Sequence, residues 1–183
     1  MIYSLDDVRK YVYRDTPTGV IIDTNLLILL LIGNYDPIFI REYKQLNNSD
    51  KKYTEEDFEL LKQVLACFKK VIITPQIIAE LSNLSITKSG VPENRFPLYL
   101  QKVIAFLKVA DEQHQKSSCL WGMEMKMIRD FGFTDMTILE LAKNNNMAVL
   151  TDEAPFWRRF NTEIPIITLQ NIKNNVYQEL LSS

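Results

Sequence analysis

The stretch VIIDTNLLILLLI, from Val20 to Ile32, is the most apolar part of the chain and decides its fold. It opens with β-branched residues, which are typical of a buried parallel strand, and an apolar helix begins at Leu26. The run is too short to span a bilayer and carries Asp23 and Asn25 inside it, so we expect it in a protein core. The sequence therefore predicts a strand-to-helix junction with an acid at its tip.

Three more short apolar runs are predicted as strands: Val71–Thr74, Ala148–Thr151 and Pro165–Leu169. Between the strands lie segments with caps or apolar residues at helical spacing. Helices are expected from about Ser4 to Tyr13, Thr54 to Lys69, Gln76 to Leu84, Phe96 to Gln115, Trp121 to Arg129 and Asp135 to Lys143, and at the C-terminus. Strands that alternate with helices predict an α/β layer fold with a mainly parallel central sheet flanked by helices.

The length and composition favour one ordinary globular domain over residues 1–183. The chain has 183 residues, of which 46% are hydrophobic and 24% charged, enough for one sizeable core. A polar stretch from Asn34 to Tyr53 interrupts the pattern, and we interpret residues 34–54 as an insertion, a loop or loosely attached helix with a short helical piece starting at Asp36-Pro37.

The charge balance gives no global signal for nucleic-acid binding, because the formal net charge is only -2. Any attraction for a polyanion must be local, and the basic residues that supply it are the pair Lys69 and Lys70, the pair Arg158 and Arg159, and Lys88. Such pairs are also common on ordinary solvated surfaces. The N-terminal segment is charged and lacks the apolar stretch of a secretory signal, so we expect a cytoplasmic protein with no membrane attachment.

Several classes of site are excluded by residue content. His114 is the only histidine and lies in the polar segment DEQHQK, far from any motif. Cys67 and Cys119 show no metal or redox spacing. No glycine-rich phosphate loop occurs either. Nucleophilic triads, zinc sites and nucleotide-driven chemistry therefore have no support, and acidic residues remain the only candidate group.

Four acids fall at similar places in the predicted elements. Asp23 ends the first strand, Glu80 lies in the first helix after the second strand, Asp135 opens a helix, and Asp152 ends the third strand. In a parallel α/β sheet, the strand ends and the helix starts share one edge, where ligands bind. We therefore expect the four carboxylates to meet at that edge.

Carboxylates held together repel one another unless a cation or protons compensate, and oxygen ligands suit Mg²⁺ or Mn²⁺ rather than Zn²⁺. Such a site activates water and stabilises charge on a phosphoryl oxygen. The acids thus predict a divalent-metal cofactor and phosphodiester hydrolysis.

The same segments resemble the acidic motifs of the PIN-domain nuclease family. They are IIDTN (Ile21 to Asn25), TPQIIAEL (Thr74 to Leu81), FTDMTILELAK (Phe133 to Lys143) and VLTDEAPF (Val149 to Phe156). The order is that of the family, and the resemblance covers most of the chain. It implies a PIN-like three-layer fold and makes Asp23, Glu80, Asp135 and Asp152 metal ligands or their close supports.

By the same resemblance, Asn25 and Thr151 orient carboxylates or water. Glu153 either supplements or replaces Asp152, because the last acid of the family varies in position. Asp152 is preferred since it directly follows the apolar strand. The resemblance also implies an RNA substrate, cleavage to 5′-phosphate and 3′-hydroxyl ends, and a kinship with toxins that are inhibited by an antitoxin protein. The N-terminal helix and the insertion make this chain longer than those compact toxins.

Each acid also has an ordinary structural explanation. Asp23 at a strand end can cap the next helix, Glu80 can be a solvated helix residue, Asp135 can be a first-turn acid, and Asp152 can belong to a turn. Two other functions remain open, a catalytically weak RNA-binding or assembly module and a structure-specific DNA nuclease. The apolar helix from Phe96 to Leu107 also offers a face for a homodimer.

Overall fold

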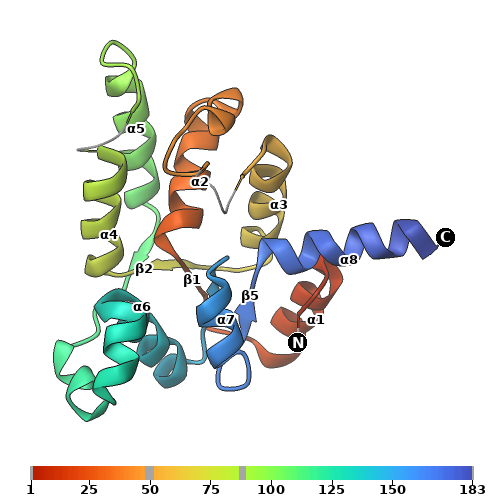
Figure 1. The fold of residues 1–183 in the computed structure, drawn as a ribbon, viewed down its shortest axis with the longest axis vertical. Coiled ribbons are helices and arrows are strands. Elements are labelled where there is room, and N and C mark those ends of the chain that lie inside the picture. The colour runs from red at the N-terminus through yellow and green to blue at the C-terminus, as the bar shows by residue number, and fades with distance from the viewer. Residues whose placement is uncertain (1, 48–51, 87–89, 183) are drawn as a thin grey trace.

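The computed structural model describes residues 2–47, 52–86 and 90–182 and has an α/β architecture (Figure 1). Its strands form one sheet in which every pairing is parallel, in the order β3-β2-β1-β4-β5. The strands are β1 (Val20–Ile22), β2 (Val71–Ile73), β3 (Asp111–Glu112), β4 (Ala148–Leu150) and β5 (Ile166–Ile167). The predicted α/β fold with a mainly parallel sheet is confirmed, and within the described residues the sheet is entirely parallel.

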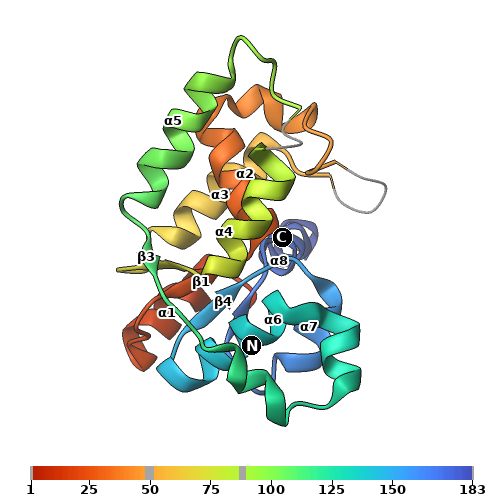
Figure 2. The ribbon, with the colours of Figure 1, turned by 90° about the vertical axis from the view of Figure 1, so that its left-hand side faces the viewer.

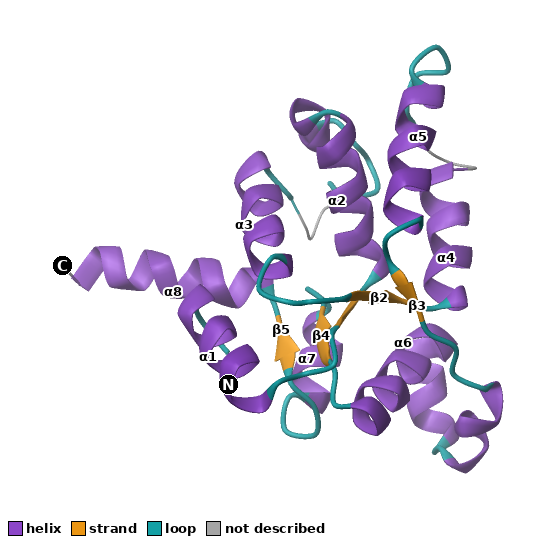
Figure 3. Ribbon diagram, turned by 180° about the vertical axis from the view of Figure 1, so that it is seen from behind, coloured by secondary structure: helices purple, strands orange, loops and turns teal. Residues whose placement is uncertain are grey.

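Helices cover the sheet on both sides, as a three-layer fold requires (Figures 1 and 3). The group above the sheet in Figure 1 comprises α2 (Thr24–Tyr35), α3 (Glu55–Leu65), α4 (Pro75–Leu81) and α5 (Phe96–Leu107). The group below it comprises α6 (Met125–Asn145) and α7 (Ala154–Phe160). The chain begins with α1 (Leu5–Asp15) and closes with α8 (Leu169–Ser182), while shorter turns are η1 (Pro37–Arg41), η2 (Ser82–Ile86) and η3 (Ser117–Gly122).

The stretch that begins with β1 forms the centre of the molecule. All of β1 is buried because it pairs with β2 on one side and β4 on the other. Helix α2 is apolar on every side, as expected of a helix surrounded by protein, and it packs against α3, α4 and α5. The approach of α3 is so close that a Cβ on Gly33 would overlap the Phe58 ring.

The strand order places a crevice beside β1. From β1 the chain moves to β2 and β3 on one side, then returns to β4 and β5 on the other. The order therefore reverses between β1 and β4, and ligands of open α/β sheets bind outside the carboxyl ends of the strands at such a reversal. Asp23 follows β1 and Thr151 follows β4, so both lie at this point.

Helix α1 matches its prediction because its start is strongly capped. The Ser4 side chain accepts a hydrogen bond from the Asp7 N–H, and the Asp7 carboxylate accepts one from the Ser4 N–H. These two bonds satisfy backbone donors that the first helical turn leaves open.

One predicted helix was too long. The helix expected from Phe96 to Gln115 ends at Leu107, and the chain then forms β3, whose Asp111 and Glu112 pair with Ile72 and Ile73 of β2. His114 follows this edge strand as an exposed residue instead of lying in a helix tail.

The predicted insertion is packed more tightly than expected. The short helical piece predicted at Asp36-Pro37 is η1. Tyr43, Leu46 and Tyr53 are all buried, so this segment contributes side chains to the core. Residues 48–51 lie outside the described chain.

Within the described residues, no helix combines the length and the apolar character needed to cross a membrane.

Candidate active site

A pocket of about 420 Å³ lies beside the junction of β1 and α2. Four acids from different parts of the chain line it: Asp23, Glu80, Asp135 and Glu153. Among the described residues that form its wall, none carries a positive charge. Figure 2 shows α4 directly above α6, the two helices that contribute Glu80 and Asp135. The structure therefore brings three of the four predicted acids to one place, together with Glu153.

Asp23 is held by β4 rather than by its own helix. Its backbone N–H donates to the carbonyl of Leu150 at 3.0 Å, and its Oδ2 accepts a hydrogen bond from the Thr151 hydroxyl at 2.8 Å. The residue occupies the N-cap position of α2, yet within the described chain its side chain makes no capping bond. A carboxylate that is only 6% exposed is therefore aimed across the sheet, which helix capping does not explain.

Glu80 joins two helices through both of its carboxylate oxygens. The Thr24 hydroxyl on α2 donates to Oε2 at 2.7 Å, and the Thr134 hydroxyl on α6 donates to Oε1 at 2.9 Å. Glu80 is half-buried, so it is not the solvated helix residue of the ordinary explanation. Its carboxylate is therefore fixed in the pocket wall by Thr24, which follows Asp23, and by Thr134, which precedes Asp135.

Asp135 is placed by an interruption of α6. Gly132 has a φ of 81° and a ψ of 176°, outside helical geometry, so the helix restarts immediately before Asp135. This break falls between the two helices that the sequence predicted, Trp121 to Arg129 and Asp135 to Lys143. Just after the break, the Thr134 hydroxyl donates to Glu80.

Glu153 and its supports form the fourth side of the pocket. The Asn25 side-chain amide donates to Glu153 Oε1 at 3.0 Å, and the Glu153 N–H donates to the Thr151 hydroxyl oxygen at 3.1 Å. Thr151 thus connects Glu153 to Asp23. Asn25 and Thr151 each donate a hydrogen bond to a carboxylate, Asn25 to Glu153 and Thr151 to Asp23.

Asp152 faces a different neighbourhood. Its Oδ2 accepts from the Tyr53 hydroxyl at 3.3 Å, and its Oδ1 accepts from the backbone N–H of Gln170, in the first turn of α8, at 3.3 Å. Across the described chain, the pocket wall includes Glu153 and not Asp152. The geometry therefore gives Asp152 a position that anchors the first turn of α8, which differs from the turn role considered from the sequence.

Tyr53 is a neighbour of the acids that sequence reasoning missed. It is 6% exposed, and burial raises the pKa of its phenol well above the usual range, with Asp152, Asp23 and Glu153 raising it further. The phenol is therefore a hydrogen-bond donor at neutral pH. No local sequence pattern predicts this role of Tyr53, because its partners are distant in sequence.

Asn83 is the second residue that the sequence did not indicate. It lines the pocket from η2, a π-helical turn that continues α4. Wide turns of this kind often occur at functional sites, but they have no reliable sequence signature.

The basic pairs proposed from the sequence lie elsewhere. Lys70 pairs with Asp111 and Arg159 pairs with Glu163, both as exposed surface contacts. Neither pair of basic residues contributes to the described wall of the acid-lined pocket. Lys88 lies outside the described residues.

The donor chemistry of the pocket fits a hard divalent cation. Its four carboxylates offer only oxygen, which Mg²⁺ and Mn²⁺ prefer, and their mutual repulsion falls when a cation binds. Nowhere in the described chain are three acidic, histidine or cysteine side chains already gathered as a metal-holding group. A carboxylate has about four acceptor positions, so it can accept from hydroxyl and amide donors and also bind a cation.

No family model matches this chain, and no curated protein matches it. Its function must therefore be inferred from its own residues and their geometry.

Proposed function

We propose that this protein is a divalent-metal-dependent endoribonuclease of the PIN type, which hydrolyses phosphodiester bonds in RNA. The observation that carries the proposal is the convergence of Asp23, Glu80, Asp135 and Glu153 on one pocket without a compensating positive side chain in its described wall. Four carboxylates in such a place favour a bound cation. The reversal of strand order beside β1 is also where α/β sheets bind ligands.

The four acids would hold Mg²⁺ or Mn²⁺ through their carboxylate oxygens. When bound, the metal supplies Lewis-acid stabilisation of phosphoryl charge and a more acidic water. The protein supplies orientation, since Thr151 fixes Asp23 and Asn25 fixes Glu153. Preorganised groups of this kind lower the reorganisation cost of reaching the transition state. The products expected from the family resemblance carry 5′-phosphate and 3′-hydroxyl ends.

The direct test is cleavage of a labelled RNA with Mg²⁺ or Mn²⁺ by the wild type, Asp23→Asn and Asp135→Asn. We expect each variant to lose at least about 100-fold in kcat/KM, the scale of removing one preorganised electrostatic group. Glu112→Gln, which changes an exposed acid on β3, is the matched control and should retain full activity. Equal cleavage by wild type and both active-site variants would remove these acids from the mechanism.

The same assay separates the two alternative functions. Faster cleavage of a branched or single-stranded DNA than of RNA would identify a DNA nuclease. Tight RNA binding without cleavage, combined with no heat of Mn²⁺ binding in a calorimetric titration, would identify a binding or assembly module instead.

A toxin role, with a cognate antitoxin as partner and cytoplasmic RNA as target, is the biological setting that the family resemblance suggests. Growth arrest on induced expression of the wild type, but not of Asp23→Asn, is the outcome that supports this setting.

A further inference from the structure

An exposed aromatic ring stands at the edge of the acid-lined pocket. Phe133 contributes to the pocket wall, yet 64% of the residue is exposed. Single apolar residues on a surface are common and need no explanation. Phe133 is different because this large apolar ring is exposed beside four carboxylates.

The backbone around Phe133 holds the ring in this outward position. Phe131, two residues earlier, packs its ring 5.0 Å from Phe160 and 6.3 Å from Phe156. Gly132 then turns the chain with its φ of 81°. After the turn, Thr134 donates to Glu80, and the Phe133 carbonyl accepts from the Thr137 hydroxyl at 2.7 Å. Both flanks of Phe133 are anchored, so its exposure is imposed by the local structure.

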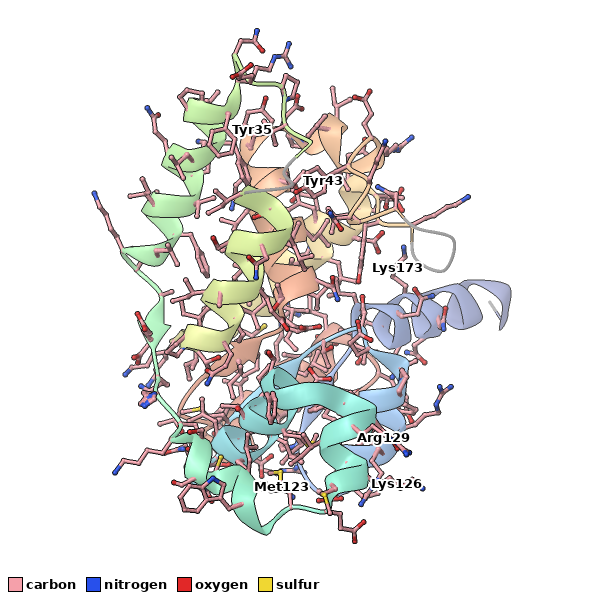
Figure 4. The ribbon with its side chains drawn as sticks, turned by 60° about the vertical axis from the view of Figure 1, so that its left-hand side comes forward. Tyr35, Tyr43, Met123, Lys126, Arg129 and Lys173 are labelled. Atoms are coloured by element: carbon pink, nitrogen blue, oxygen red, sulfur yellow. The ribbon has the colours of Figure 1, made fainter. Side chains whose placement is uncertain are left out.

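Positive charge lies on the same helix. Lys126 and Arg129 are exposed on the first half of α6, before the break at Gly132 (Figure 4). Arg129 pairs with Asp130 at 3.0 Å, whereas Lys126 makes no ion pair with any other described residue. The acids themselves repel phosphate, so attraction for a nucleic-acid strand must come from cations outside the pocket wall, and Lys126 and Arg129 lie on the helix that carries Phe133.

We propose that Phe133 is a base-stacking residue that holds one nucleotide of a single-stranded nucleic acid at the edge of the pocket. This inference rests on the proposed nuclease function and names the form of substrate that the site accepts. Exposed aromatic rings beside positive charge are how proteins bind unpaired strands, because every base presents a face for stacking. A base in a duplex is already stacked on both sides and cannot present that face to Phe133.

Stacking is tested by binding, separately from cleavage. The probe is a labelled single-stranded RNA of about ten nucleotides and mixed sequence, within the usual length bound by such surfaces. Its affinity is measured in Ca²⁺ by fluorescence anisotropy for the wild type, Phe133→Ala and Phe133→Trp. Phe133→Ala should weaken binding about fivefold or more, the lower limit for loss of one stacked base, whereas Phe133→Trp should retain it. Tyr13→Ala, which removes an 89% exposed aromatic from α1, is the control and should bind like the wild type.

A second measurement assigns the effect to a base. Abasic nucleotides are introduced one position at a time, and at one position the loss of the base should weaken binding to the wild type but not to Phe133→Ala. Three results would overturn the proposal: equal affinity of wild type and Phe133→Ala, no single-strand binding by the wild type, or equal abasic effects in both proteins. If the wild type cleaves RNA but the abasic effect does not depend on Phe133, only the stacking role is contradicted. If the abasic effect depends on Phe133 but the wild type does not cleave RNA, only the nuclease assignment is contradicted.

Discussion

Asp152 and Glu153 are adjacent in sequence but serve different surroundings. Thr151 contacts Asp23, Asp152 contacts Tyr53 and the start of α8, and Glu153 lines the pocket. Successive side chains of an extended segment point to opposite sides, so Thr151 and Glu153 share one side and Asp152 takes the other. The acid that directly follows a strand is therefore not automatically the acid at the site.

Under the proposed nuclease function, Glu153→Gln should lower kcat for RNA cleavage by about 100-fold, the effect of removing a charged group from the acid-lined pocket. Asp152→Asn should lower it by no more than about tenfold, the low end of the 10–100-fold range for loss of an orienting residue, because an amide oxygen still accepts from Gln170. Single-turnover rates of the two variants provide the comparison. A larger loss for Asp152→Asn would restore Asp152 as the fourth acid.

At the scale of elements, the break in α6 is the feature on which the pocket depends. Gly132 adopts a conformation that is essentially restricted to glycine, and it separates Phe131, whose ring packs on Phe160, from Phe133 and Asp135. A Cβ at Gly132 would meet nothing within 4 Å, so the requirement for glycine comes from the backbone torsion alone. The interruption redirects the helix so that its second half presents Thr134 and Asp135 to the pocket.

Gly132→Ala should therefore destabilise the protein by about 1–3 kcal/mol, the cost of holding a non-glycine residue in this region. The matched control is Gly122→Ala, since Gly122 also has open space around it but does not require a positive φ. That control should be neutral or slightly stabilising. Urea unfolding of both variants tests the difference, and equal free energies of unfolding would contradict a backbone requirement at Gly132.

The sequence did not predict β3, which shows that backbone pairing with a neighbouring strand can outweigh the local sequence pattern. Asp111 and Glu112 have no apolar alternation, and the segment resembled the tail of a helix. It is a strand because its backbone pairs with β2, and the Gln113 N–H extends the pairing to the Ile73 carbonyl at 2.9 Å. An edge strand needs only one covered side, so its side chains can remain polar.

At the scale of the whole molecule, the fold buries phenols among its helices. Burial raises the pKa values of Tyr43, Tyr53 and Tyr99 above their usual range. The nearby acids raise the pKa of Tyr53 further. Figure 4 shows Tyr43 among the helices above the sheet, far from Met123 at the opposite end. The fold therefore favours the protonated form of all three phenols.

This burial predicts lower stability at alkaline pH. An unfolded tyrosine loses its proton near pH 10, while these phenols keep theirs in the fold. Above about pH 10 the unfolded state binds fewer protons, so the free energy of unfolding falls as the pH rises. Urea unfolding at increasing pH should show this decline, with phenolate absorbance appearing on unfolding. Tyr53→Phe should make the decline shallower, and an unchanged pH dependence in that variant would contradict the shifted pKa of Tyr53.

The sequence by itself determined the alternation of strands and helices and the acid at the end of β1. These features are encoded locally, in the apolar run from Val20 to Ile32 and in the capping pattern at Ser4 and Asp7. Hydrophobic periodicity and capping act over a few residues, so a single chain segment reveals them.

Only the tertiary structure decided which polar groups share the pocket. The choice of Glu153 over Asp152, the burial of Tyr53 beside the acids, and the use of Thr134 as a donor to Glu80 all depend on partners that are distant in sequence. Each follows from the way parallel strands and their crossover helices bring remote segments to one sheet edge. Local patterns fix what a segment forms, whereas long-range packing fixes which side chains meet.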